Sequence, residues 1–153
     1  MPRTVLTYGT FDLFHIGHLR LLQRARGLGD RLVVAVSTDE FNQVKGKRCI
    51  IPYRQRAEIV ENIKCVDLVV PENTWDQKTE DIKLHGIDTF VMGSDWKGKF
   101  DFLNEFCQVV YLERTSKIST TDLKQKLKSA LSVDTTQIVQ MIDILKQLKA
   151  DLE

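Results

Sequence analysis

The sequence has no long apolar run, few cysteines and almost no net charge, and each of these shortages excludes a class of protein. No segment approaches the roughly 20 apolar residues that are needed to cross a bilayer. The three cysteines (Cys49, Cys65 and Cys107) are odd in number and far apart, which excludes a disulfide framework and a zinc-binding spacing. A formal net charge of +1 excludes a polybasic nucleic-acid binder.

The chain also lacks a secretory pattern, an internal repeat and a low-complexity segment. From Met1 it runs into a strand pattern without the apolar region of a signal peptide. What is present is the mixture of an ordinary globular protein, with 42% hydrophobic and 28% charged residues in 153 positions, enough for one domain. We expect a cytoplasmic protein with reduced thiols and no membrane insertion.

Strand and helix patterns alternate along the chain. The predicted strands are 4–8, 31–37, 66–70, 89–92 and 109–112, and the main predicted helices are 18–28, 54–64, 79–84 and 119–131. Continuous apolar strands separated by helices are typical of a parallel sheet covered on both faces. The sequence therefore predicts an α/β fold, a doubly wound sheet of about five strands. In such sheets ligands bind beyond the carboxyl ends of the strands.

The strongest functional pattern directly follows the first predicted strand. It reads Gly9-Thr10-Phe11-Asp12-Leu13-Phe14-His15-Ile16-Gly17-His18. His15 and His18 flank a helix start, where free N–H groups and the dipole favour an anion, and Gly17 lets a nucleotide lie against the backbone. One alternative is a zinc site, which needs three or four ligands, although His85 is the only other histidine. The other is a pair of ordinary surface histidines, which leaves the flanking residues unexplained.

Further candidates follow two later strands. After strand 89–92 come Gly93, which permits close approach, and Asp95, which is either a ligand of a base or ribose or a turn aspartate. After strand 109–112 comes Arg114, and then Ser119 and Asp122 form the pattern of a capping box. The same helix start can offer its remaining N–H groups as a second phosphate cradle.

Cations cluster in the loop after the second strand. Lys45, Lys47 and Arg48 lie within four positions, and Arg54 and Arg56 follow. This cluster is either a site for a small anion or a solvated loop. Asp39, which precedes it, is interpreted as a helix cap.

These phosphate-binding patterns suit nucleotidyl transfer to a phosphate acceptor. Charge then develops on the α-phosphate and on the leaving pyrophosphate, so the reaction needs positioning and donors more than a covalent nucleophile. The acceptor phosphate is already an anion, which fits a chain without an evident catalytic triad. A divalent ion such as Mg²⁺ would travel with the triphosphate rather than occupy a metal site of the protein.

Taken together, these motifs resemble the cytidylyltransferase family of the His-x-Gly-His nucleotidylyltransferases. The likeness covers about residues 3 to 128 and includes Ser37-Thr38-Asp39-Glu40-Phe41-Asn42, Trp75-x-Gln77-Lys78 and Val91-Met92-Gly93-x-Asp95-Trp96. It implies a Rossmann-like catalytic domain over residues 1–130, usually a homodimer. The implied reaction is transfer of CMP from CTP to a small phospho-alcohol. Glycerol 3-phosphate is favoured, and phosphoethanolamine, phosphocholine or another polyol phosphate is the alternative.

The resemblance also implies roles for individual residues. The catalytic residues would be His15, His18, Lys47, Arg114 and Ser119. Further nucleotide contacts would come from Thr10, Phe11, Asp12, Ile16, Gly17, Gly93, Asp95, Thr115, Ile118, Thr120 and Thr121. The acceptor would be held by Lys45, Lys78 and Lys64. By analogy, the product would serve a teichoic-acid-like or capsular polymer.

Two departures from the family pattern concern site loops. The family commonly has arginine where this chain has Lys64, and lysine loses the bidentate fork. The family's Arg-Thr-Glu-Gly-Ile-Ser-Thr is here Arg114-Thr115-Ser116-Lys117-Ile118-Ser119-Thr120, without the acid and the glycine. A non-catalytic nucleotide sensor would be expected to lack some phosphate-contacting residues, and here they are present. An aromatic cage for choline would need residues such as Tyr53, Trp75 and Trp96 to converge.

The chain continues about 25 residues past the usual family end. Residues 131–153 predict an amphipathic helix with a start resembling a capping box at Asp134 and Gln137. Its apolar residues follow heptad spacing (Ile138, Met141, Leu145, Leu148 and Leu152), and Ile142 widens the stripe. We expect an oligomerisation element, and packing on the chain's own sheet is the alternative.

Overall fold

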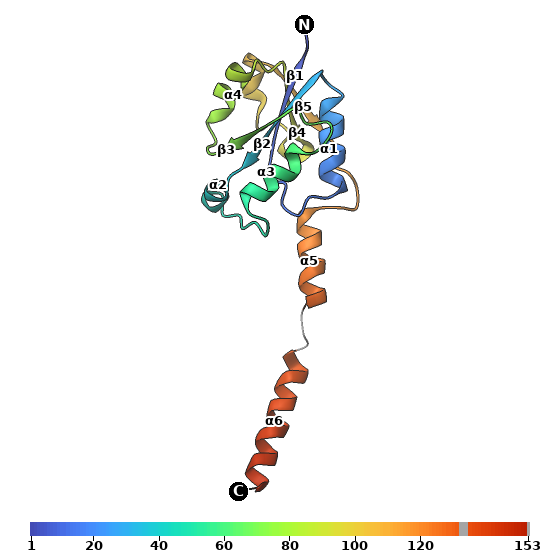
Figure 1. The fold of residues 1–153 in the computed structure, drawn as a ribbon, viewed down its shortest axis with the longest axis vertical. Coiled ribbons are helices and arrows are strands. Elements are labelled where there is room, and N and C mark those ends of the chain that lie inside the picture. The colour runs from blue at the N-terminus through green and yellow to red at the C-terminus, as the bar shows by residue number, and fades with distance from the viewer. Residues whose placement is uncertain (132–134, 153) are drawn as a thin grey trace. The chain divides into compact units, whose positions relative to one another are not determined.

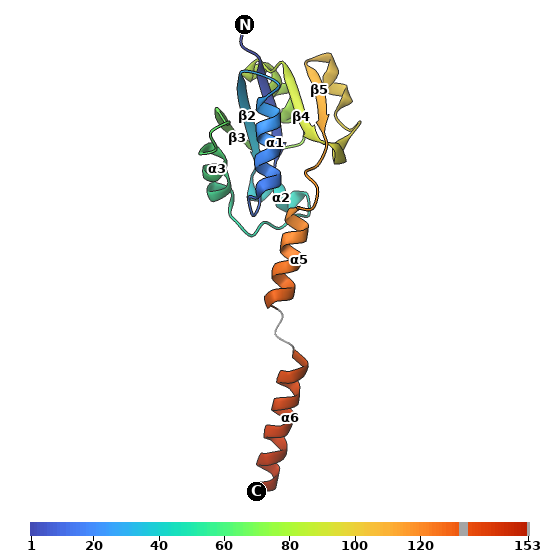
Figure 2. The same cartoon turned by 90° about the vertical axis from the view of Figure 1, so that its right-hand side faces the viewer.

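The computed structural model describes residues 1–131 and 135–152. The chain divides into two compact units, Met1–Thr120 and Thr121–Glu153. The first unit contains a five-stranded, fully parallel sheet in the order β3-β2-β1-β4-β5 (Figure 2). The predicted α/β fold is confirmed. Among the described residues, no helix is both long and apolar enough to cross a bilayer.

The strands lie close to their predicted positions, with one informative exception. Their bounds are β1 Thr4–Gly9, β2 Arg31–Ser37, β3 Leu68–Glu72, β4 Thr89–Gly93 and β5 Gln108–Leu112. The third strand was expected to stop before Pro71, and this was wrong. Because β3 is an edge strand, Pro71 can pair with Val36 while its missing N–H faces away from the sheet. Glu72 therefore becomes the carboxyl end of β3.

Helices cover both faces of the sheet (Figure 1). The elements of the first unit are α1 Ile16–Arg26, α2 Asp39–Val44, α3 Tyr53–Glu61, α4 Gln77–His85 and the 3-10 turns η1 Ser94–Trp96 and η2 Asp101–Glu105. Leu22 and Ala25 of α1 and Val60 of α3 join the core on one face. Ile82 of α4 and Leu103 of η2 join the core on the other. Alternate strand residues thus supply two cores, as a doubly wound sheet requires.

The second unit is helical and carries an exposed apolar stripe. It contains most of α5, Thr120–Leu131, and all of α6, Thr135–Leu152. Helix α5 begins directly after Ser119, as the capping pattern predicted. The predicted stripe of α6 and its neighbours are all exposed: Ile138, Val139, Met141, Ile142, Ile144, Leu145, Leu148 and Leu152. The predicted helix is confirmed, although Asp134, its expected cap, lies outside the described residues.

Candidate active site

His15 and His18 cap the start of α1, and this role determines which nitrogen of each ring remains a donor. The Nδ1 atom of His15 accepts the N–H of Gly17 at 3.0 Å, and the Nδ1 atom of His18 accepts the N–H of His15 at 3.2 Å. A ring nitrogen that accepts a hydrogen bond carries no proton, so each neutral imidazole bears its hydrogen on Nε2. The rings stack with centroids 3.8 Å apart. Two Nε2–H donors therefore stand side by side at the helix start.

Both histidines are neutral at physiological pH. Burial, reinforced by the nearby His15, lowers the pKa of His18 to about 4. Burial and then the charge of Arg114 lower the pKa of His15 below its ordinary value. Thr120 supports the same tautomer, because its hydroxyl donates to the carbonyl of Asp12 at 3.1 Å and lies 3.3 Å from Nε2 of His15. The two rings are therefore uncharged when no anion is bound, and they can still donate hydrogen bonds to an anion.

The backbone around the two histidines is unusually tight. A side chain on Gly17 would come within 2.8 Å of the His15 ring and 3.2 Å of Ile118. Gly17 was expected to make room for a nucleotide, and in this structure the His15 ring fills that room. Phe11 and Leu13 have positive φ angles of 54° and 49°, which are costly for residues with a side chain. Backbone strain of this kind concentrates at functional sites.

Asp12 and Arg56 are buried and hold the neighbouring loops in place. The carboxylate of Asp12 accepts the N–H groups of Ile50 and Ile51, both at 2.9 Å, and so fixes the loop that carries the lysines. Arg56 donates to the carbonyls of Ile51, Thr10 and Ser37 and forms an ion pair with Asp39 at 2.7 Å. The suggestion that Arg56 belongs to an anion site is therefore wrong, because its donors hold the ends of β1 and β2 instead.

Asp39 also has a different role from the one expected. Thr38 caps α2, and Asp39 accepts the N–H of Tyr53, the first residue of α3, at 2.8 Å. Asp39 therefore caps a helix, as expected, but this helix is α3 rather than α2.

A buried cluster of charges lies at the carboxyl ends of β2 and β3. Lys78 forms an ion pair with Oε1 of Glu72 at 3.0 Å, and Lys45 lies 3.6 Å from Oε2. The hydroxyl of Ser37 donates to Oε2 of Glu72 and accepts from Lys45, both at 2.6 Å. Burial lowers the pKa of Lys45, and Glu72 offsets part of that effect. Two ammonium groups and one carboxylate leave this cluster with a net positive charge.

The cluster opens into a small cavity with aromatic walls. The cavity measures about 120 Å³ and is lined by Tyr8, Lys45, Lys47, Glu72, Trp75, Lys78, Trp96 and Phe100 among others. Trp75 and Trp96 converge there with ring centroids 6.4 Å apart. Tyr53, the third suggested cage residue, instead lies near Arg56. A positively charged cavity of this size suits a small anion and is too small for a nucleotide.

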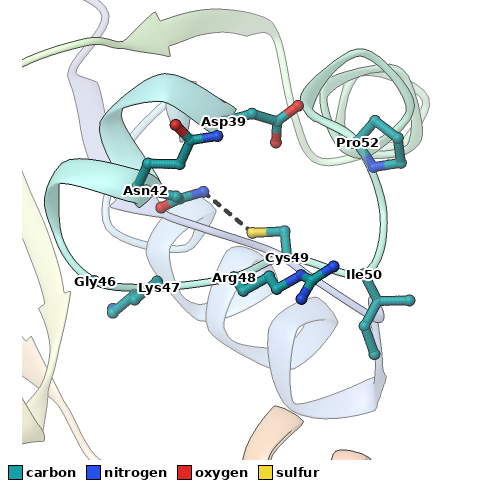
Figure 3. A pocket seen from close by; sticks show the side chains of 9 residues that line it. Asp39, Asn42, Gly46, Lys47, Arg48, Cys49, Ile50 and Pro52 are labelled. Atoms are coloured by element: carbon teal, nitrogen blue, oxygen red, sulfur yellow. Dashed lines mark hydrogen bonds between the residues drawn. The ribbon is translucent and has the colours of Figure 1, made fainter.

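A larger and more open cavity of about 510 Å³ lies beside α2 and the following loop (Figure 3). Lys47 and Arg48 border it, and Asn42 donates to the sulfur of Cys49 at 3.1 Å. Because Lys47 is exposed and lines both cavities, it is placed to meet a ligand that spans them. Lys45 and Lys47, which the sequence places in one cluster of cations, therefore line the same small cavity.

Of the remaining predicted site residues, some lie at the carboxyl ends of β4 and β5, and one lies at the opposite edge of the sheet. Asp95 and Arg114, from the ends of β4 and β5, form an exposed ion pair at 3.1 Å. Space in front of Gly93 is open. Lys64, by contrast, precedes β3 and lies at the amino edge of the sheet, so this chain does not bring it together with Lys45 and Lys78.

Two of the remaining residues belong to the segment that joins β5 to α5, and a third lies on α5. Thr115 and Ser119 are half-buried in it, and Thr121 is exposed on α5 in the second unit.

Sequence reasoning missed Glu72 and Tyr8. The signal for Glu72 was an acid directly after an apolar run, and it was overlooked because Pro71 was taken as the end of the strand. Tyr8 is the last aromatic residue of β1, and its hydroxyl donates to Asp81 of α4. Burial and this bond raise the pKa of Tyr8, so the phenol stays neutral. Within residues 1–131 and 135–152, no three His, Cys, Asp or Glu side chains lie close enough to hold a metal ion.

Comparison with known proteins identifies the family of this chain. The model of the family described as "Cytidylyltransferase-like" matches residues 6–126. The chain is 58% identical over 125 residues to the glycerol-3-phosphate cytidylyltransferase of Bacillus subtilis, covering 82% of this chain and 97% of that protein. The Staphylococcus aureus protein of the same name is 55% identical over 125 residues, covering 82% and 95%.

A solved structure provides an independent comparison of the fold. A protein from Thermoplasma volcanium, described as a lipopolysaccharide core biosynthesis protein, matches with a TM-score of 0.67 and 25% identity. The match covers 76% of this chain and all of that one. The sheet, the paired histidines and these relatives lead to one conclusion: the chain belongs to the cytidylyltransferase family, on the branch of the glycerol-3-phosphate cytidylyltransferases.

Proposed function

We propose that this protein transfers CMP from CTP to glycerol 3-phosphate and releases pyrophosphate. A phosphate oxygen of the acceptor forms a bond to the α-phosphorus of CTP, while the bond from that phosphorus to the oxygen bridging to the β-phosphate breaks. The main observation in support of this proposal is a pair of neutral Nε2–H donors on the same sheet edge as a small, buried, positively charged cavity. The relatives named glycerol-3-phosphate cytidylyltransferase support the choice of substrates.

The two histidines stabilise charge rather than move protons. Their Nδ1 atoms are used in capping α1, so each ring carries one fixed Nε2–H, which His15 shares with the Thr120 hydroxyl at 3.3 Å. Donors held in place before the reaction stabilise the charge that develops on phosphate oxygens in the transition state. Arg114 and Lys47 supply further positive charge for the triphosphate, and Ser119 supplies a hydroxyl donor. Asp95 is assigned to the cytidine.

The acceptor occupies the cavity of Lys45 and Lys78. Both ammonium groups are buried, so their attraction for a phosphate is screened less than that of surface lysines. A divalent ion would accompany CTP as part of the substrate and would supply positive charge to the triphosphate. Lys64 lies at the opposite edge of the sheet from these two lysines of the same chain.

Activity with defined substrates tests the proposal. Pyrophosphate release is followed with CTP or ATP and a panel of glycerol 3-phosphate, phosphoethanolamine and phosphocholine. We expect CTP and glycerol 3-phosphate to give the highest kcat/KM. Comparable turnover with ATP would exclude the cytidine assignment, and faster turnover with another acceptor would exclude glycerol 3-phosphate. Binding of CTP without turnover of any acceptor would favour a nucleotide sensor.

Helix α6 is assigned to self-association. Its exposed stripe follows heptad spacing, and two heptads are too short for stability without a partner. The region matched by the family model ends at residue 126, so this helix is an addition to the catalytic domain. A second copy of α6 offers the same stripe and is the proposed partner in a homodimer. Cys49, Cys65 and Cys107 fit a reducing compartment such as the cytoplasm, and the product would feed a glycerol-phosphate polymer.

A further inference from the structure

The acceptor cavity has the aromatic walls of a cation-binding site, but a cation of the protein already occupies it. The ammonium of Lys78 lies 4.3 Å from the ring centroid of Tyr8, 5.4 Å from that of Trp75 and 5.5 Å from that of Phe100. Distances below about 6 Å allow cation–π attraction, which is how proteins also recognise choline-like head groups. We call Tyr8, Trp75 and Phe100 the aromatic cage.

Glu72 holds Lys78 in the aromatic cage. The Lys78 side chain is 3% exposed, the Glu72 side chain is 5% exposed, and their charged atoms are 3.0 Å apart. The second oxygen of Glu72 accepts from Ser37 and lies near Lys45, so the carboxylate is held from both sides. Withdrawal of Lys78 would leave this buried carboxylate short of a partner, which is strongly unfavourable in a protein interior. The ammonium is therefore a permanent part of the cavity.

The walls of the aromatic cage are held as firmly as its occupant. Gln77 accepts the N–H groups of Asn73 and Thr74 and donates to the carbonyl of Pro71, which fixes the short loop carrying Trp75. Asp81 accepts from both Gln77 and the hydroxyl of Tyr8. A ligand consequently meets a preformed cage that is closed to cations by charge and by volume.

We propose that Lys78 determines acceptor specificity by filling the aromatic cage with its own ammonium. A phospho-alcohol that carries a cation is rejected because Lys78 already lies against Tyr8, Trp75 and Phe100 and the cavity is already positive. An acceptor with a phosphate and a neutral alcohol is retained, because its anion meets the two lysines. The inference rests on the proposed function and explains how that site would discriminate between phospho-alcohols.

Three variants separate the charge of Lys78 from its volume. Lys78→Ala removes the ammonium that lies against Tyr8 and Phe100 and leaves only that of Lys45, 5.5 Å from the ring of Trp75, whereas Lys78→Met removes the Lys78 charge and keeps most of the bulk. Lys83→Ala is the matched control, because Lys83 lies on the same helix with its ammonium 5.2 Å from the ring of Phe106, outside the cavity. For each variant, kcat/KM is measured with CTP and either glycerol 3-phosphate or phosphocholine. Choline binding is measured separately by calorimetry.

Loss of a charged hydrogen-bond donor predicts a fall of about 10- to 100-fold in kcat/KM for glycerol 3-phosphate in both Lys78 variants. The ratio of kcat/KM for phosphocholine to kcat/KM for glycerol 3-phosphate should be about 10-fold higher in Lys78→Ala than in Lys78→Met. Of the two variants, only Lys78→Ala should bind choline. Lys83→Ala should match the wild type. Circular dichroism verifies folding, and Lys78→Ser, which opens the same space with a polar side chain, replaces the alanine variant if that variant unfolds.

Two results would overturn the inference. One is a folded Lys78→Ala protein that neither binds choline nor differs from Lys78→Met in its acceptor ratio. The other is a wild-type protein that binds choline as tightly as Lys78→Ala does. A wild-type enzyme that ignores glycerol 3-phosphate would instead contradict the proposed function, because choline binding to the alanine variant does not depend on turnover.

Discussion

Replacement of His18 by asparagine should separate the two roles of this ring. Nδ1 caps the helix by accepting the N–H of His15 at 3.2 Å, and Nε2–H is the donor assigned to the transition state. The side-chain oxygen of asparagine lies about where Nδ1 lies, so His18→Asn keeps the capping acceptor and removes the donor. His18→Ala removes both.

The expected magnitudes differ for rate and stability. Loss of one preorganised donor costs about 10²–10³-fold in rate, so both variants should lose turnover to that extent at saturating CTP. Loss of a capping bond costs about 1 kcal/mol, so only His18→Ala should show a lower free energy of unfolding at neutral pH. Steady-state pyrophosphate release and denaturant titration measure the two quantities. Normal turnover in His18→Asn, with the protein folded, would refute the catalytic role.

The same residue predicts a pH dependence of stability. The pKa of His18 is about 4 in the folded protein and about 6.5 in an unfolded chain. Because the folded pKa is lowered, the unfolded state binds more protons between these values, and stability falls as the pH drops from 6.5 to 4. The expected loss in the free energy of unfolding over this pH range is about 3 kcal/mol. His18→Asn has no imidazole at this position, so its free energy of unfolding should not show this loss. An identical pH profile in the two proteins would mean that His18 titrates normally.

Three further predictions concern other parts of the chain. Glu72→Gln leaves two buried ammonium groups without their carboxylate and should lower the free energy of unfolding by about 3–5 kcal/mol. The control is Glu80→Gln, which changes an exposed residue and should alter the free energy of unfolding little. Equal denaturation midpoints for the two variants would contradict the buried cluster. Lys117 has a φ of 66° where the family has glycine, so Lys117→Gly should preserve stability or raise it by up to about 1 kcal/mol, and a lower melting temperature would argue against strain there. Truncation after Ser129 should leave a folded, active enzyme with fewer subunits by light scattering or a lower melting temperature. An unchanged number of subunits together with an unchanged melting temperature would exclude an interface role for α6, and complete loss of activity in a folded truncation would give α6 a part in catalysis.

The parts of this protein that sequence alone determined are those governed by local patterns. β2 was predicted to the residue, because an uninterrupted apolar run between Arg31 and Ser37 has one reasonable interpretation in an α/β chain. The start of α5 and the helical extension were predicted from capping and periodicity for the same reason. The rule that ligands bind beyond the carboxyl ends of strands was enough to single out the two histidines and the lysine loop.

Long-range contacts decided the rest. Whether Pro71 ended its strand depended on β3 being at the edge of the sheet, and no local signal shows which strand is at an edge. The role of Arg56 depended on carbonyls from three separate segments, and its neighbour Arg54, of the same residue type, is exposed. Lys78 is similarly one lysine among many in the sequence. It becomes the occupant of an aromatic cage only because β1, the end of β3, and the segments around α4 and Phe100 bring Tyr8, Glu72 and two further rings to the same point. Charge and aromaticity are properties of residues, but their energies depend on distance and burial, which the tertiary structure alone determines.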